Sequence, residues 1–232
     1  MIKTTLFQDW HLLENDKTII RAMNKEGVSH ITEYQYTHLR KAIRFCKRKR
    51  HCLDVGANIG TMSYHLAKEF KAVHAFEIQP EMQEVLELNM RKFPETKKKV
   101  ITYPFGLSSC ERLVSTVYDP QSSFATHIDP SLKQGSILVK SLDSLQIENL
   151  NLIVKNDFYT IIKLDVEGQE AECIRGGINT IKKYGPVILF ENKKHSQRYN
   201  DTKKTVLDIL EPLGYKQLDD VGSKNMLIGV GV

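Results

Sequence analysis

The chain has 232 residues and 41% hydrophobic content, which is enough for one α/β domain with a full core. Its net charge of +5 is local, because residues 1–51 carry +6 and the remainder carries −1. The sequence has no run of about 18 apolar residues and no signal peptide pattern at its start. We therefore expect a cytoplasmic protein without membrane insertion.

The four cysteines, Cys46, Cys52, Cys110 and Cys173, form no C-x-x-C pair. This spacing favours buried thiols in a reducing compartment over disulfides or a zinc site. The densest basic run, "KRKRH" at 47–51, could contact a phosphate-bearing partner. We favour the simpler interpretation, a solvated charge run that precedes a buried strand.

The first half of the chain predicts helices that alternate with strands. Residues 33–47 carry apolar side chains at helical spacing, and we expect this helix to pack on the sheet edge, within a basic helical extension formed by residues 1–50. The main domain is expected over residues 51–232. Its first elements are a strand at 51–55, a helix at 60–70, a strand at 72–78, a helix from Pro80 to near Pro94 and a strand at 99–107.

The middle of the chain is less regular. Two β-like runs, "RLVSTVY" and "SILVKSL", indicate an insertion of a hairpin and a loop at about 110–157. Regular alternation then returns with a strand at 159–168, a helix at 169–184, a strand at 186–192, a helix at 202–213 and a closing pair of strands at 215–220 and 225–232.

These strands are apolar throughout, whereas a half-exposed strand would be apolar at every second residue. Such strands, alternating with helices, predict a parallel sheet that is covered on both faces. The expected fold is a doubly wound three-layer α/β sandwich. Ligands of such sheets bind at the carboxyl ends of the strands.

The stretch "CLDVGANIGT" at 52–61 joins the first strand to the next helix and predicts a ligand-binding turn. Gly56 permits a tight turn and the close approach of a ligand. Twenty-one residues later, Glu77 ends the second strand, where a carboxylate can accept hydrogen bonds from both ribose hydroxyls. The candidate cofactor-binding residues here are Asp54, Gly56, Ala57, Asn58, Gly60 and Glu77.

The missing glycines indicate which cofactor fits. A dinucleotide fingerprint that starts at Gly56 requires glycine at the positions of Asn58 and Thr61. The observed pattern suits a ligand without pyrophosphate that places an amino-acid moiety against the turn, namely S-adenosylmethionine. The alternative is a turn that only joins strand to helix.

The motifs "LDVGANIG", "AFEIQP", "SLDSL", "IIKLDVEGQE" and "PVILFEN" together resemble the FkbM family of S-adenosylmethionine-dependent methyltransferases, over residues 33–192. The resemblance implies a Rossmann-like, mostly parallel seven-stranded sheet whose last strand is antiparallel. It also implies O-methylation of a hydroxyl on a sugar, polyketide or related small molecule. Residues 110–140 match no named pattern, and we expect acceptor specificity there.

Three acids end two of the later strands and are the candidate catalytic residues: Asp165, Glu167 and Glu191. Methyl transfer to a hydroxyl needs alignment of the reactants and a proton acceptor. Asp165 could be the base or could hold the methionine amino group, whereas Glu167 could be only a favourable first-turn acid. A divalent cation held by the three acids is the lesser alternative, and we assign no metal ligand.

Ser108, which follows the third strand, is assigned to the cofactor site near the adenine, although a plain turn serine is an equal alternative. His195 could be a base, but it lies in a polar loop, and a solvated or substrate-contacting role is favoured for it and for His127 in the insertion. The main rival function is methylation of a nucleic acid such as RNA, and a noncatalytic cofactor-binding module is a third class. The sequence lacks a base-flipping tetrad and aromatic residues among the basic run, which disfavours nucleic acid. The oligomeric state stays open.

Overall fold

The structure is a computed structural model that describes residues 2–117, 122, 126–132, 135–147, 159–191, 194–199, 205–221 and 225–230. Residues 148–157, the last part of the expected insertion, lie outside the described residues.

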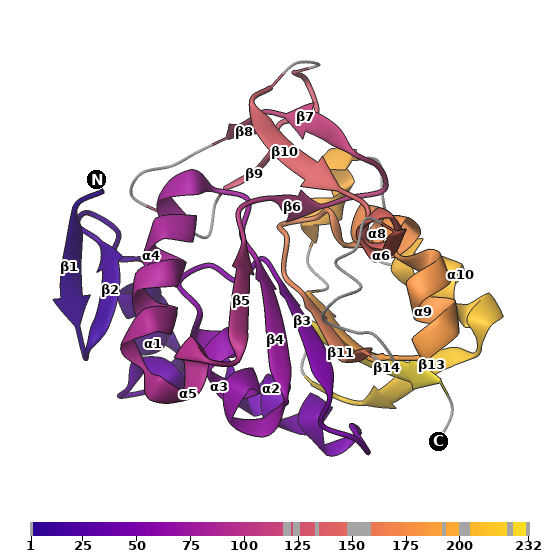
Figure 1. Ribbon diagram of the computed structural model, residues 1–232, viewed down its shortest axis with the longest axis horizontal. Coiled ribbons are helices and arrows are strands. Elements are labelled where there is room, and N and C mark those ends of the chain that lie inside the picture. Colours follow the sequence, from indigo (N-terminus) through magenta and orange to yellow (C-terminus); the bar gives the residue numbers. More distant parts are fainter. Residues whose placement is uncertain are drawn as a thin grey trace.

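A seven-stranded sheet forms the centre of the molecule (Figure 1). Its strands, in spatial order, are β13 (Tyr215–Asp219), β14 (Asn225–Val230), β12 (Val187–Glu191), β11 (Tyr159–Leu164), β3 (His51–Val55), β4 (Ala72–Phe76) and β5 (Val100–Tyr103). The five strands from β12 to β5 run parallel, and β14 runs antiparallel to both of its neighbours. The Rossmann-like sheet with an antiparallel closing strand is therefore confirmed.

Helices cover both faces of this sheet. One face packs against α6 (Leu142–Ile147), α8 (Glu170–Gly176), α9 (Ile178–Tyr184), α10 (Thr205–Leu210) and the 3₁₀ turn η4 (Glu211–Leu213). The other face packs against α2 (Tyr36–Arg44), α3 (Thr61–Glu69) and α4 (Pro80–Lys92), which is followed by the single turn α5 (Pro94–Lys97). Along β3, Leu53 and Val55 belong to the first core cluster and Cys52 to the second. Successive side chains of the strand thus enter cores on opposite faces of the sheet, and a strand that is buried on both faces is apolar throughout.

The position of α2 corrects the sequence-based expectation. Its buried residues Leu39 and Ile43 belong to the same core cluster as Ile161 of β11 and Leu189 of β12. The helix therefore covers the sheet face and not the sheet edge. The physical reason is that the central strands are apolar on both faces and must be shielded from water on each.

Two predicted elements are each divided into two. The expected strand at 99–107 separates into β5 and β6 (Gly106–Leu107), and Pro104, which lacks an N–H for the ladder, lies between them. The expected helix at 169–184 separates into α8 and α9 at Gly177. A side chain at Gly176 would meet the Ser108 carbonyl oxygen at 2.0 Å, so this helix end packs directly against backbone.

The N-terminal extension is helical only in part. It begins with a hairpin of β1 (Thr4–Phe7) and β2 (Trp10–Leu13), and α1 (Thr18–Glu26) and the 3₁₀ turn η1 (Ile31–Glu33) follow before α2. The hairpin turn places Gln8 and Asp9 at φ 48° and 71°. These residues are weaker signals for such a turn than Asn-Gly, which explains why the sequence did not reveal the hairpin.

The insertion forms two small sheets next to the main one (Figure 1). β10 (Ile137–Lys140) pairs antiparallel with β7 (Arg112–Val114), which confirms the hairpin-like pairing, and parallel with β6. β8 (Thr116–Val117) pairs with β9 (His127–Ile128). Within the described part of the chain, no helix has the length and apolarity needed to cross a membrane.

The N-terminal hairpin is part of the core, which leads to a testable prediction. Trp10 is 1% exposed, and its ring centroid lies 5.6 Å from that of Tyr64 and 5.0 Å from that of Phe93. Trp10→Ala should lower the free energy of unfolding by about 3–5 kcal/mol in urea denaturation, because it leaves a large cavity. Leu6→Ala on the same hairpin is the control, since Leu6 is 61% exposed. Equal effects of the two substitutions would show that the hairpin is not docked.

Candidate active site

The glycine turn connects β3 to α3 and packs against the end of β11. Gly56 has φ +78°, and a Cβ there would lie 1.9 Å from the backbone oxygen of Asp165. The Asp165 N–H in turn donates to the Val55 carbonyl oxygen at 3.1 Å. Only glycine fits at position 56, because both the left-handed backbone and the contact with β11 exclude a side chain.

The N–H groups of the turn are used within the protein. Gly56 and Ala57 both donate to the Phe76 carbonyl oxygen, at 3.0 and 2.9 Å, and Gly60 donates to Ala57. The Ile59 N–H donates to Oδ1 of Asn58 at 2.8 Å. The N–H groups of these four residues are therefore satisfied within the protein and are not free to bind a ligand. A turn of this kind offers close approach and shape, but few donors for a pyrophosphate.

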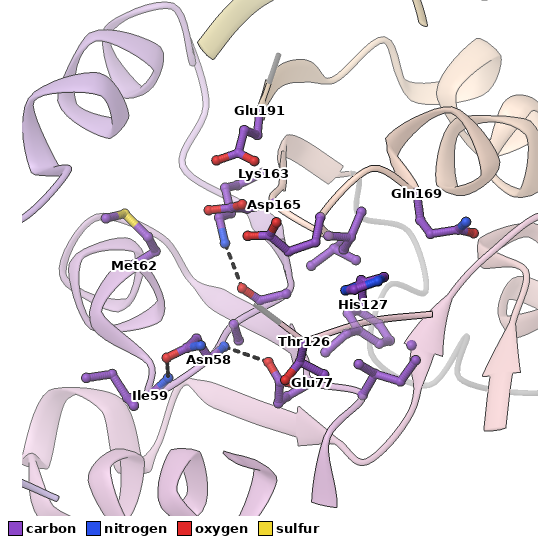
Figure 2. A pocket seen from close by; sticks show the side chains of 18 of the residues that line it. Asn58, Ile59, Met62, Glu77, Thr126, His127, Lys163, Asp165, Gln169 and Glu191 are labelled. Carbon is purple, nitrogen blue, oxygen red and sulfur yellow. Dashed lines mark hydrogen bonds between the residues drawn. The ribbon is translucent and has the colours of Figure 1, made fainter. Parts of the chain in front are cut away.

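Glu77 follows β4 and lines the pocket next to the turn (Figure 2). Its Oε2 accepts from the Asn58 N–H at 2.8 Å and its Oε1 from the Gln79 N–H at 3.0 Å. Burial raises the pKa of this carboxyl, while the two backbone donors oppose the shift. Each carboxylate oxygen keeps a second lone pair, so Glu77 can also accept from a ligand.

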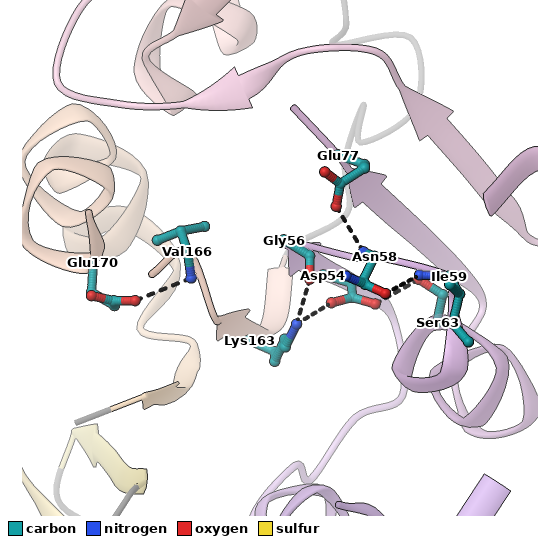
Figure 3. A network of polar contacts seen from close by, with 9 residues as sticks. All are labelled: Asp54, Gly56, Asn58, Ile59, Ser63, Glu77, Lys163, Val166 and Glu170. Atoms are coloured by element: carbon teal, nitrogen blue, oxygen red, sulfur yellow. Dashed lines mark hydrogen bonds and ion pairs between the residues drawn. The ribbon is translucent and has the colours of Figure 1, made fainter. Parts of the chain in front are cut away.

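A buried ion pair lies beneath the turn (Figure 3). Asp54 and Lys163 are register partners on β3 and β11, so their side chains emerge on the same face of the sheet. Lys163 Nζ lies 3.0 Å from Asp54 Oδ1 and donates to the Gly56 carbonyl oxygen at 2.8 Å, and Ser63 Oγ donates to Asp54 Oδ2 at 2.6 Å. Burial alone would lower the pKa of Lys163, but Asp54 and Asp165 raise it above its ordinary value.

The ion pair changes the role expected for Asp54. Asp54 is fully buried and does not line the pocket, so it supports the turn from below and does not face a ligand. Lys163 does line the pocket, and the sequence analysis missed it. The available signal was a lysine within the apolar run "TIIKLDV", since a buried lysine requires a buried acid nearby.

The three acids proposed for catalysis reach the same pocket. Asp165 and Glu167 follow β11, and Glu191 ends β12. Figure 2 shows the carboxylates of Asp165 and Glu191 close to Lys163 at one end of the pocket and Glu77 next to Asn58 at the other. Glu167 has φ +54°, and Glu191 is 7% exposed. The tertiary structure therefore brings together two groups of residues that the sequence placed at separate strand ends.

A further acid shapes the turn that carries Asp165 and Glu167. Glu170 Oε1 accepts from the N–H group of Val166 at 3.1 Å (Figure 3). It also accepts from the N–H group of Gly168 at 3.3 Å. Burial raises the pKa of Glu170 to about 7. Glu170 thus fixes the backbone between β11 and α8.

The remaining predicted cofactor-binding residues do not all line the pocket. Asn58 and Ala57 line the pocket, whereas Gly60 caps α3 at φ +96° against Leu86 and Met90. Ser108 is fully buried and donates its N–H to the Lys140 carbonyl oxygen at 2.8 Å. It is not among the residues that line the pocket, unlike its neighbour Leu107.

Two walls of the pocket come from outside the main sheet. The N-terminal segment contributes one wall and the insertion the other, and Gln169 also lines the pocket. These pocket residues, which the sequence analysis did not assign, are Ile19, Tyr34, Gln35, Thr126, His127, Ile128 and Gln169. No local sequence motif predicts that these residues line a pocket, because each reaches the pocket only when its segment packs against the rest of the chain.

The sheet order and the pocket at the carboxyl ends of its strands define a Rossmann-like fold of the methyltransferase type. The family model for the methyltransferase FkbM domain matches residues 54–216. The chain therefore belongs to the methyltransferase FkbM family, as the sequence motifs indicated.

Two similar proteins show how far the likeness extends. The chain is 30% identical over 136 residues to the hexuronic acid methyltransferase AglP of Haloferax volcanii, which covers 59% of this chain and 53% of that protein. The crystal structure of methyltransferase FkbM from Methylobacillus flagellatus KT has a TM-score of 0.51 at 15% identity and covers 93% of this chain and 48% of the other. The chain thus matches about half the length of each, and the solved structure supports the fold alone.

The ion pair beneath the turn yields a prediction. Lys163→Met leaves the Asp54 carboxylate buried without its counterion and should lower the free energy of unfolding by about 3–5 kcal/mol in urea denaturation. The double substitution Asp54→Asn with Lys163→Met removes both charges and should recover part of the loss. A double variant as unstable as the single one would argue against an electrostatic origin.

Proposed function

We propose that the protein is an S-adenosylmethionine-dependent methyltransferase that transfers a methyl group to a hydroxyl of a sugar or glycan. The observation that supports this most is a single pocket with the buried Glu77 carboxylate beside a glycine turn at one end and three acids at the other. The turn satisfies its own N–H groups, which suits a nucleoside ligand without pyrophosphate.

The residues present fit this cofactor. Glu77 is positioned to accept from ribose hydroxyls, and Gly56 and Ala57 allow the ligand to approach the backbone. When bound, S-adenosylmethionine supplies an electrophilic methyl group. The methionine end would lie toward Asp165, which can accept from its amino group.

The acids at the other end can act on the acceptor. A sugar hydroxyl is a weak acid and must lose its proton as the new bond forms, and Asp165 or Glu191 can take that proton. A general base typically contributes about 10²- to 10⁴-fold. The burial of Glu191 excludes water from its carboxylate and holds it in one orientation.

The nature of the acceptor is supported by the similar protein. AglP is described as a hexuronic acid methyltransferase, and it is 30% identical to this chain over 136 residues. A sugar acid or a related glycan is therefore the first acceptor to test. RNA is the alternative acceptor from a different class.

The function is tested in two steps. Calorimetry should detect binding of S-adenosylmethionine and S-adenosylhomocysteine and none of NAD. Methyl-labelled cofactor is then incubated with free uronic acids, uronate-containing glycans, neutral sugars and RNA, and the products are analysed by mass. Binding of NAD alone would overturn the cofactor assignment, and labelling of RNA alone would overturn the acceptor assignment.

Glu77→Ala tests the cofactor contact. Hydrogen bonds to a charged group contribute about 1.5–3 kcal/mol, so the affinity for S-adenosylhomocysteine should fall about 10- to 100-fold in calorimetry. Glu84→Ala on the exposed side of α4 is the matched control and should bind normally. Unchanged affinity of the Glu77 variant would place the ribose elsewhere.

Asp165→Asn distinguishes chemistry from binding. If Asp165 takes the proton, kcat should fall by about 10²-fold or more with little change in cofactor affinity, because asparagine keeps the shape but is not a base. If Asp165 holds the methionine amino group, affinity and rate should fall together. A variant with normal kcat and normal affinity would remove Asp165 from the site and leave Glu191 as the proton acceptor.

A further inference from the structure

Three side chains with metal-ligand chemistry meet at the acidic end of the pocket. His195 Nδ1 lies 2.5 Å from Glu167 Oε2 and 3.6 Å from Glu191 Oε2. One ligand atom from each of the three residues lies within 4.8 Å of the others. Glu167 and Glu191 also line the pocket, and the side chain of Glu191 is 5% exposed. The cluster therefore joins an imidazole to two carboxylates at the inner surface of the pocket.

The backbone is arranged to bring these residues together. His195 belongs to the 3₁₀ helix η3 (Lys194–Tyr199), which follows β12 in the chain, while Glu167 follows β11. Gly168 has φ +109°, and a Cβ there would lie 2.6 Å from the backbone carbonyl of His195. A side chain at position 168 would therefore push η3 away, and glycine allows His195 to reach the two acids.

We propose that Glu167, Glu191 and His195 bind a divalent first-row transition-metal ion such as Mn²⁺. Adjacent ligands of a six-coordinate ion at about 2.1 Å are about 3 Å apart, so the separations of 2.5 and 3.6 Å between His195 Nδ1 and the two carboxylates need adjustments of about 0.5–0.6 Å. The ligand atoms of Glu167 and Glu191 lie within 4.8 Å of each other. Carboxylates suit Mn²⁺, whereas imidazole favours transition metals over Mg²⁺. Three protein ligands leave positions open toward the pocket, as in catalytic metal sites.

This ion would reduce the negative charge at the acceptor end of the pocket. Asp165, Glu167 and Glu191 present three carboxylates there, which would repel an anionic sugar acid. A divalent ion offsets the charge of its two carboxylate ligands and offers open positions to a carboxylate or hydroxyl oxygen of the acceptor. This role of the ion rests on the proposed function, and it leaves Asp165 as the proton acceptor because Glu191 is then a ligand of the ion. The metal site itself does not rest on the proposed function.

The test measures Mn²⁺ binding by the full-length protein after treatment with a chelator. Calorimetry, together with the loss of the free-Mn²⁺ electron paramagnetic resonance signal, should show one site. Glu191→Gln and His195→Ala should each weaken binding about 10-fold or more, since even loss of an outer-shell partner typically has an effect of that size. Glu84→Gln, an equal change of charge on the exposed side of α4, should bind Mn²⁺ as the unmodified protein does.

Binding of S-adenosylhomocysteine is measured in the same samples and separates the two proposals. Retained cofactor binding in the Glu191→Gln and His195→Ala variants shows that they are folded, so their loss of Mn²⁺ supports the site. Mn²⁺ binding without any cofactor binding by the unmodified protein would leave the metal site standing and overturn the proposed function. The metal site is overturned if the unmodified protein binds no Mn²⁺, or if both substitutions leave its affinity unchanged.

Discussion

The buried pair of Asp54 and Lys163 is the interaction on which the rest of the site depends. It links β3 to β11 near the carboxyl ends of these strands, and Nζ of the same lysine donates to the Gly56 carbonyl oxygen. Buried charges are tolerated only when they are paired and hydrogen-bonded, and Ser63 supplies a further donor to the acid. The ion pair and its hydrogen bonds thus specify both the register of β3 against β11 and the path of the glycine turn.

The position of the turn determines what each end of the pocket can do. With Gly56 in contact with the Asp165 backbone, the cofactor end and the acidic end are separated only by the width of two neighbouring strands. Glu77 directly follows β4, on the outer side, and Glu191 lies beyond β11, at the end of β12. A ligand that reaches from Glu77 toward the acids therefore passes over the turn, where glycine at position 56 lets the backbone pack directly against Asp165.

Residues outside the main sheet complete the pocket. Tyr34 and Gln35 come from the N-terminal extension, and Thr126 and His127 come from the insertion. Thr126 Oγ1 donates to Gln79 Oε1 at 2.9 Å, which connects the insertion to the segment that follows Glu77. Burial raises the pKa of Tyr34, and the nearby Glu26, Asp165, Glu191 and Glu167 raise it further. These walls come from segments outside the main sheet, so the shape of the pocket depends on how those segments dock.

The sequence by itself determined the sheet, its flanking helices, the turn at Gly56 and the acids at 77, 165 and 191, because periodicity and strand ends are local properties. It could not determine that Asp54 pairs with Lys163, that Ser108 is buried away from the pocket or that α2 covers a sheet face. It also could not bring His195 to Glu167, since the two residues are joined only by the packing of η3 on Gly168. Such contacts depend on strand register and segment docking, and these are decided by the packing of the whole chain and not by any local stretch of it.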